Sequence, residues 1–119
     1  MIVCHKLQNN NIVAEVLPGF VKISSSEEIL DLIAEAGYQD CIALIMHCES
    51  LHEDFFDLKT GLAGEILQKF SNYRMKLSVI GDFSGYGGKS LKDFIRESNR
   101  TGIITFVGSP EEAFSRLNK

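Results

Sequence analysis

An uninterrupted apolar run over residues 41–46 is the feature that most restricts the fold of this chain. Such a run is typical of a parallel strand buried on both faces, because a strand with one solvated face alternates apolar with polar residues. Helix-like patterns, with apolar residues three and four apart, lie on either side of it, at residues 25–36 and about 59–74. The alternation predicts an α/β domain with right-handed crossovers.

The rest of the chain extends the same alternation. Apolar stretches at residues 2–7 and 12–17 flank an asparagine-rich turn, which predicts an N-terminal β-hairpin. Residues 20–23 form either a third short strand or only a link. Further strands are expected at residues 76–81 and 103–107. We therefore expect a mixed, mainly parallel sheet with an antiparallel edge and about four helices.

Local signals predict where the helices begin and end. Serine accepts a hydrogen bond from the first turn of a helix, proline fits its first position, and glycine adopts the left-handed backbone that ends one. The signals are Ser25 with Glu28 and then Gly37 for the first helix, Ser90 and Gly102 for the third, and Ser109 with Pro110 for the fourth.

Size and charge narrow the classes of partner. The 119 residues form one domain, residues 1–119, and the net charge of −4 argues against nucleic acid or an anionic membrane as the partner. No apolar run reaches the roughly 20 residues of a membrane span, and no signal-peptide pattern is present. Three cysteines do not form a disulfide framework. We expect a cytoplasmic protein without a cofactor.

Any site is expected beyond the carboxyl ends of the parallel strands, where ligands bind in sheets of this kind. Residues 47–57, residues 82–89 and the turn after residue 107 meet there. The first of these loops contains His47, Cys48 and His52 among carboxylates, all of which are residue types that bind zinc. Their spacing matches no compact zinc pattern, so we interpret this loop as a solvated acidic connection and predict no metal.

Two further patterns occur at this edge. Residues 81–90 end in Gly-Lys-Ser like a phosphate-binding loop, but Phe83 stands where that motif needs glycine. A flexible connection capped by Ser90 is the favoured interpretation. Carboxylates lying close together could instead share a proton and perform acid–base chemistry. The acidic residues that could do so are Glu49, Glu53, Asp54, Asp57 and Asp82.

The segments DLKTGLAGEILQKF (57–70), KLSVIGDF (76–83) and SLKDFIRESN (90–99) closely resemble a bacterial family known only as a domain of unknown function, DUF4180. The order of elements is also similar to the STAS domain of anti-sigma factor antagonists. In that family a strand is followed by Asp-Ser-Ser/Thr-Gly-Leu and a helix, and a serine or threonine there is phosphorylated by a partner kinase. Asp57 and Thr60-Gly61-Leu62 occupy comparable places, with one extra residue between them.

The resemblance implies a non-enzymatic regulatory or protein-binding module. The outer edge of the hairpin could also pair with a second copy and give a homodimer. Thr60 can equally be only a helix cap. The rival is a small-molecule-binding domain or small enzyme that uses the acidic loop 47–57 and the loop 82–89. A deep pocket lined by its residues would favour the rival, and a flat exposed surface around Thr60 the module. The candidate residues are Asp57, Lys59, Thr60 and Gly61 for the module, and Glu49, Asp82 and Ser84 for the rival.

Overall fold

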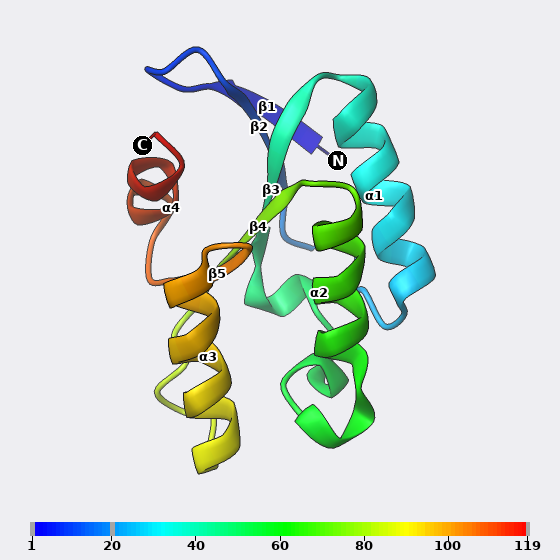
Figure 1. Cartoon of the computed structure of the whole chain (residues 1–119), viewed down its shortest axis with the longest axis vertical. Helices are drawn as coiled ribbons and strands as arrows, with labels where there is room; N and C mark the ends of the chain where they lie inside the picture. Colours follow the sequence, from blue (N-terminus) through cyan, green and yellow to red (C-terminus); the bar gives the residue numbers. More distant parts are fainter. Residues whose placement is uncertain (1, 20, 119) are drawn as a thin grey trace.

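A five-stranded sheet, with its strands side by side in the order of the chain, organises the molecule (Figure 1). The computed structural model describes residues 2–19 and 21–118. The hairpin strands β1 (Ile2–Lys6) and β2 (Ile12–Val16) are antiparallel. The strands β3 (Cys41–His47), β4 (Lys76–Ile80) and β5 (Ile104–Val107) continue parallel to β2. The predicted mixed, mainly parallel sheet is confirmed.

Helices cover both faces of this sheet. The helices α1 (Ser26–Tyr38), α2 (Leu62–Asn72) and α3 (Lys89–Thr101) pack on one face, whereas α4 (Pro110–Leu117) packs on the other. Figure 1 shows α1 and α2 on one side of the strands and α4 on the opposite side. Three short 3₁₀ turns carry the chain from β3 to α2: η1 (Cys48–Ser50), η2 (Glu53–Phe55) and η3 (Leu58–Thr60).

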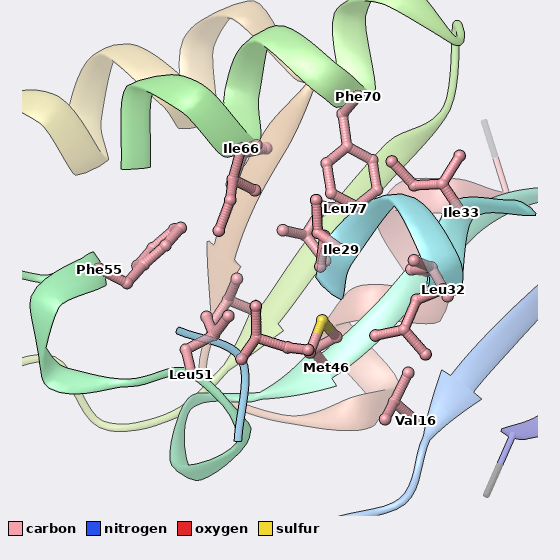
Figure 2. Close-up of a cluster of buried hydrophobic side chains, with 14 of the residues drawn as sticks. Val16, Ile29, Leu32, Ile33, Met46, Leu51, Phe55, Ile66, Phe70 and Leu77 are labelled. Atoms are coloured by element: carbon pink, nitrogen blue, oxygen red, sulfur yellow. The ribbon is translucent and has the colours of Figure 1, made fainter. Parts of the chain in front are cut away.

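The central strand β3 contributes to both halves of the core. Successive side chains of a strand point to opposite faces. Leu44 and Met46 therefore join the cluster under α1, α2 and α3, while Ala43 and Ile45 join the cluster under α4. Figure 2 shows the larger cluster, in which Phe70 of α2 lies above the sheet. This two-sided burial explains why the strand carries apolar residues without alternation.

The two outer edges of the sheet differ. At β5, the side chain of Asn99 accepts a hydrogen bond from the backbone N–H of Phe106 at 2.7 Å and donates one to its carbonyl at 3.3 Å. The carboxamide thus takes the place that a neighbouring strand would occupy. At β1, within residues 2–19 and 21–118, no side chain bonds the backbone of the outer edge in this way. The hairpin edge is therefore the open one.

Three of the predicted helix boundaries are confirmed, and three are wrong. Ser25 and Ser109 cap α1 and α4, and Gly102 ends α3 in the left-handed conformation. Gly37, however, lies inside α1, which continues to Tyr38 because Asp40 takes the left-handed backbone at φ 63° instead.

Ser90 is not the cap of α3. The cap is Gly88, two residues earlier, whose φ of 94° suits glycine, and the helix begins at Lys89. The helix α2 begins at Leu62 rather than near Lys59, because Gly61 has a left-handed backbone that separates α2 from η3.

Of the expected segment 20–23, Ile23 forms only an isolated bridge to Leu51, and Phe20 lies outside the described residues. Within the described residues, no helix has the length and apolar character needed to cross a membrane.

We expect Phe70→Ala to lower the free energy of unfolding by about 3–5 kcal/mol, because Phe70 is fully buried between α2 and the sheet. Urea denaturation followed by circular dichroism measures this change. Tyr38→Ala is the control: the side chain is 91% exposed, so its effect should stay within about 0.5 kcal/mol. Equal effects for the two variants would contradict the described core.

Candidate functional site

The carboxyl edge of the parallel strands is held in place by packed aromatic rings. Phe56, after η2, stacks on Tyr86 of the loop that follows β4, with ring centroids 4.5 Å apart. Phe83 of the same loop meets Phe106 of β5 edge to face at 5.3 Å. Gly81 at the start of this loop is in close contact with Cys48, since a Cβ at that position would lie 2.6 Å from the cysteine sulfur. The two loops are therefore packed against each other.

A shallow hollow of about 600 Å³ opens beside these rings. One wall consists of Phe56 and the turn from Asp57 to Lys59, and the other consists of residues 87–91 at the start of α3. No side chain caps the first N–H groups of α3, and these groups carry the positive end of the helix dipole. Lys59, Lys89 and Asp57 also line the hollow, and Lys89 is paired with Asp93 at 3.0 Å, so the rim carries charges of both signs. The shape of the hollow is open rather than deep.

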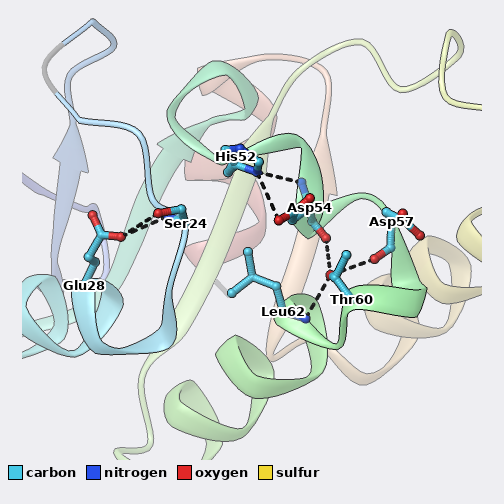
Figure 3. Close-up of polar contacts among 7 residues, drawn as sticks. All are labelled: Ser24, Glu28, His52, Asp54, Asp57, Thr60 and Leu62. Atoms are coloured by element: carbon cyan, nitrogen blue, oxygen red, sulfur yellow. Dashed lines mark hydrogen bonds and ion pairs between the residues drawn. The ribbon is translucent and has the colours of Figure 1, made fainter.

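Thr60 lies beside the hollow and joins η2, η3 and α2 (Figure 3). Its hydroxyl donates to the carbonyls of Asp54, at 2.6 Å, and Asp57, at 2.9 Å. The same oxygen accepts a hydrogen bond from the N–H of Leu62 at 3.2 Å. The residue is nevertheless exposed. The hydroxyl therefore supports the start of α2 and remains within reach of a partner.

The structure brings together only part of the predicted set. Asp57, Lys59, Thr60 and Gly61 belong to the same turn, in which the Asp57 carboxylate accepts a bond from the N–H of Lys59 at 3.2 Å. Asp82 and Ser84 instead bond each other. The Asp82 carboxylate accepts the Ser84 hydroxyl at 2.6 Å and its N–H at 3.0 Å, and these bonds lower the pKa of Asp82.

Glu49 lies neither in the turn around Thr60 nor beside Asp82 and Ser84. It lines a separate hollow of about 330 Å³ with Gly19, Val21 and Lys22. The residues proposed for an acid–base site therefore do not line the hollow beside Thr60, apart from Asp57. Both loops expected for the rival, residues 47–57 and 82–89, contribute to this hollow through Phe56, Asp57 and residues 87–89, whereas its candidate residues Glu49, Asp82 and Ser84 do not.

The histidines of the acidic loop also separate. His52 accepts a hydrogen bond from the N–H of Asp54 at 3.0 Å and so caps η2. His47 lies at the end of β3 and bonds Glu15. Among residues 2–19 and 21–118, no three histidine, cysteine or acidic side chains form a group that could hold a metal ion.

Sequence reasoning missed a polar cluster on the α4 side of the sheet. Both oxygens of the Glu15 carboxylate, whose side chain is 17% exposed, are paired: one with His47 Nε2 at 2.8 Å and the other with His5 Nε2 at 3.0 Å. Burial opposes ionisation of Glu15, but the two histidines outweigh it, so the pKa of the carboxyl lies below its usual value. Only the strand register, which places Val3 opposite Glu15 and His5 opposite Val13, brings these residues together.

The fold and its carboxyl edge define an α/β domain with a sequentially ordered sheet. Residues 8–117 match the model of the family described as a domain of unknown function, DUF4180, and the chain belongs to this family. Comparison with curated proteins and with solved structures found no match.

The Glu15 cluster predicts a pH-dependent stability. Because the pKa of Glu15 is lowered in the folded state, its contribution is complete above the unfolded value of about 4.3 and is lost as the pH falls through the lower folded value. We expect Glu15→Gln to cost about 1–3 kcal/mol at pH 5.5, and this cost should shrink toward pH 3. Urea titrations at several pH values measure it. Glu35→Gln, on the exposed side of α1, is the control. A cost that does not change with pH would contradict the assignment.

Proposed function

We propose that this chain is a non-enzymatic regulatory or protein-binding module with a STAS-like fold, acting in the bacterial cytoplasm. The surface proposed for recognition is the turn from Asp57 to Gly61 together with the adjoining hollow. The observation that carries the proposal is that these predicted residues lie together on one exposed edge, beside an open and shallow depression. A surface of this shape suits a protein partner better than an enclosed substrate.

The order of elements supports the STAS-like part of the proposal. An N-terminal hairpin is followed by helices α1, α2 and α3, which pack on the same face of a sequentially ordered sheet. The helix α2 begins directly after Thr60-Gly61, as the phosphorylated helix does in the family that the sequence resembles.

Phosphorylation of Thr60 would act on this surface in two ways. The hydroxyl proton would be lost, and with it the bonds donated to the carbonyls of Asp54 and Asp57. A phosphate with a charge of about −1.5 to −2 would also lie near Asp57 and near Glu65 in the first turn of α2, where like charges repel. Modification would therefore both loosen the turn and change the charge that a partner meets.

The alternative is a small-molecule-binding domain or small enzyme at the same edge. Its residues Glu49, Asp82 and Ser84 do not line the hollow beside Thr60. The favourable observation is that Lys59 and the start of α3 line the hollow together with Asp57, since a helix start with free N–H groups would suit an anionic ligand. That ligand would contact the two loops first expected, residues 47–57 and 82–89, but at other residues than Glu49, Asp82 and Ser84.

Affinity capture from a lysate of the native host tests the module. We expect wild-type protein to retain a specific protein partner, and Thr60→Glu to lose it, because the substitution adds a negative charge at the recognition surface. Bound proteins are identified by mass spectrometry.

Thr60→Ala is the matched control for this experiment. It removes the same hydroxyl hydrogen bonds as Thr60→Glu but adds no charge. The alanine variant should keep the partner, although the lost hydroxyl hydrogen bonds should cost about 1 kcal/mol of stability. If Thr60→Glu binds as well as wild type, the recognition surface is elsewhere. If neither bait retains a protein, the anionic-ligand alternative gains support.

We also propose that the module forms a homodimer through β1. A strand at a sheet edge presents unpaired N–H and C=O groups that can bond a second copy. Asn99 bonds the opposite edge at Phe106, whereas among the residues that the structure describes β1 is paired only with β2. Antiparallel pairing of two β1 strands would join the two sheets about a twofold axis.

Sedimentation equilibrium across a range of protein concentrations tests this pairing. We expect a mass of two chains at the higher concentrations. Val3→Pro should shift the equilibrium toward the monomer, because proline fits poorly into a paired strand. Val13→Ala lowers stability without altering the outer edge, and so controls for a general loss of fold. A single-chain mass at every concentration would refute the dimer.

A further inference from the structure

Two of the three cysteines meet on the α1 side of the hairpin. Cys4 lies on β1, directly opposite Ala14 of β2, and Cys41 begins β3, opposite Ile12 of the same middle strand. Their side chains reach toward each other across β2, and the two Sγ atoms are 3.9 Å apart. The small side chain of Ala14 leaves room for this approach.

The end of α1 places oxygen atoms around the two thiols. The side-chain carbonyl of Gln39 accepts a hydrogen bond from the Cys4 thiol at 3.1 Å, and its backbone carbonyl lies 4.0 Å from the Cys41 sulfur. Gln39 is the C-cap of α1 and directly precedes the left-handed Asp40. Cys4 is exposed, whereas Cys41 is 6% exposed. One sulfur of the pair is therefore open to solvent and the other is sheltered.

The distance between the sulfurs distinguishes two kinds of thiol chemistry. A disulfide bond is about 2.05 Å long, so the sulfurs would have to approach by roughly 1.9 Å while anchored on strands separated by β2. Two thiolates that bind one metal ion at about 2.3 Å are 3.9 Å apart when the angle at the metal is about 115°. That angle is close to tetrahedral, so a shared metal ion requires far less movement than a disulfide.

We propose that Cys4 and Cys41 form a two-thiolate site for a soft, thiophilic metal ion, with the Gln39 side-chain oxygen beside it. Among the described residues, no third histidine, cysteine or acidic side chain joins the pair, so the remaining positions fall to Gln39 and solvent. Thiolates select soft ions such as Cu⁺ and Zn²⁺ over hard ions such as Mg²⁺. The site is independent of the turn around Thr60.

Binding exchanges protons for the metal. Each thiol gives up its S–H proton to the solvent and forms one sulfur–metal bond, so a divalent ion releases two protons and no electron is transferred. Because these protons must leave before the sulfur–metal bonds form, affinity rises with pH. The bound ion would connect β1 to β3 and hold the open edge strand against the sheet.

Titration of the reduced, untagged protein with Cd²⁺ tests the site, because thiolate binding produces a sulfur-to-metal absorption band in the ultraviolet. We expect one ion per chain for wild type. We expect Cys4→Ser and Cys41→Ser each to weaken binding by at least about tenfold, since changes that only touch a ligand's neighbours already cost about 10–100-fold. Competition with Zn²⁺ and Cu⁺ then ranks the soft ions, and Mg²⁺ should not compete.

Cys48→Ser is the matched control, because it removes the one remaining thiol of the chain, which contacts Gly81 at the other end of β3. It should bind Cd²⁺ like wild type. Equal binding by Cys4→Ser and wild type, or loss of binding in Cys48→Ser alone, would overturn the proposal. Rapid loss of two thiols in air, with a mass decrease of about 2 Da and no metal band, would show a disulfide pair instead.

Discussion

Burial of β3 on both faces is the constraint on which the rest of the molecule depends. A strand buried on both faces needs paired neighbours for its backbone and apolar cover above and below. The strands β2 and β4 pair with its backbone, and the helices α1, α2 and α4 supply the apolar cover. With three crossover helices on one face, only α4 covers the other, and it is just eight residues long. The α4 side therefore retains polar groups that must bond one another.

Those polar groups are paired within the sheet itself. The hydroxyls of Ser78 and Thr105, both buried, lie 2.9 Å apart on neighbouring strands. Glu15 is paired with two histidines from the strands on either side of it. A buried polar group without a partner costs about 1–3 kcal/mol, so these pairs allow a thinly covered face to remain folded. The primary role of these pairs is therefore to stabilise the fold, and any chemical role is secondary to it.

The sequence was sufficient for the order of elements, because patterns such as residues 41–46 and the caps Ser25 and Ser109 act locally. It failed where two local signals competed. Gly37 was a plausible helix stop, but Asp40 took the left-handed position. Gly88 rather than Ser90 preceded α3. For the site, the turn from Asp57 to Gly61 is contiguous and could be predicted. The pairing of Glu15 with His5 and His47 depends on strand register, which no single segment of the chain specifies.

The hairpin and the carboxyl edge of the sheet are stabilised by different interactions, so the two regions should respond differently to a change of conditions. Around Thr60, packed aromatic rings such as Phe55 and Phe56 support the turn, so its position depends on the core. The outer strand β1 is largely exposed, and besides the pairing of β1 with β2 the hairpin is held by side-chain contacts at three points. His5 bonds Glu15, Cys4 lies beside Cys41, and Asn9 in the hairpin turn donates to the carbonyl of Leu117 at the end of α4. Protons would act on the first of these contacts and soft metal ions on the second, and both contacts involve β1. A change of conditions should therefore alter the free edge of the sheet, where a second copy would pair, before it alters the surface around Thr60.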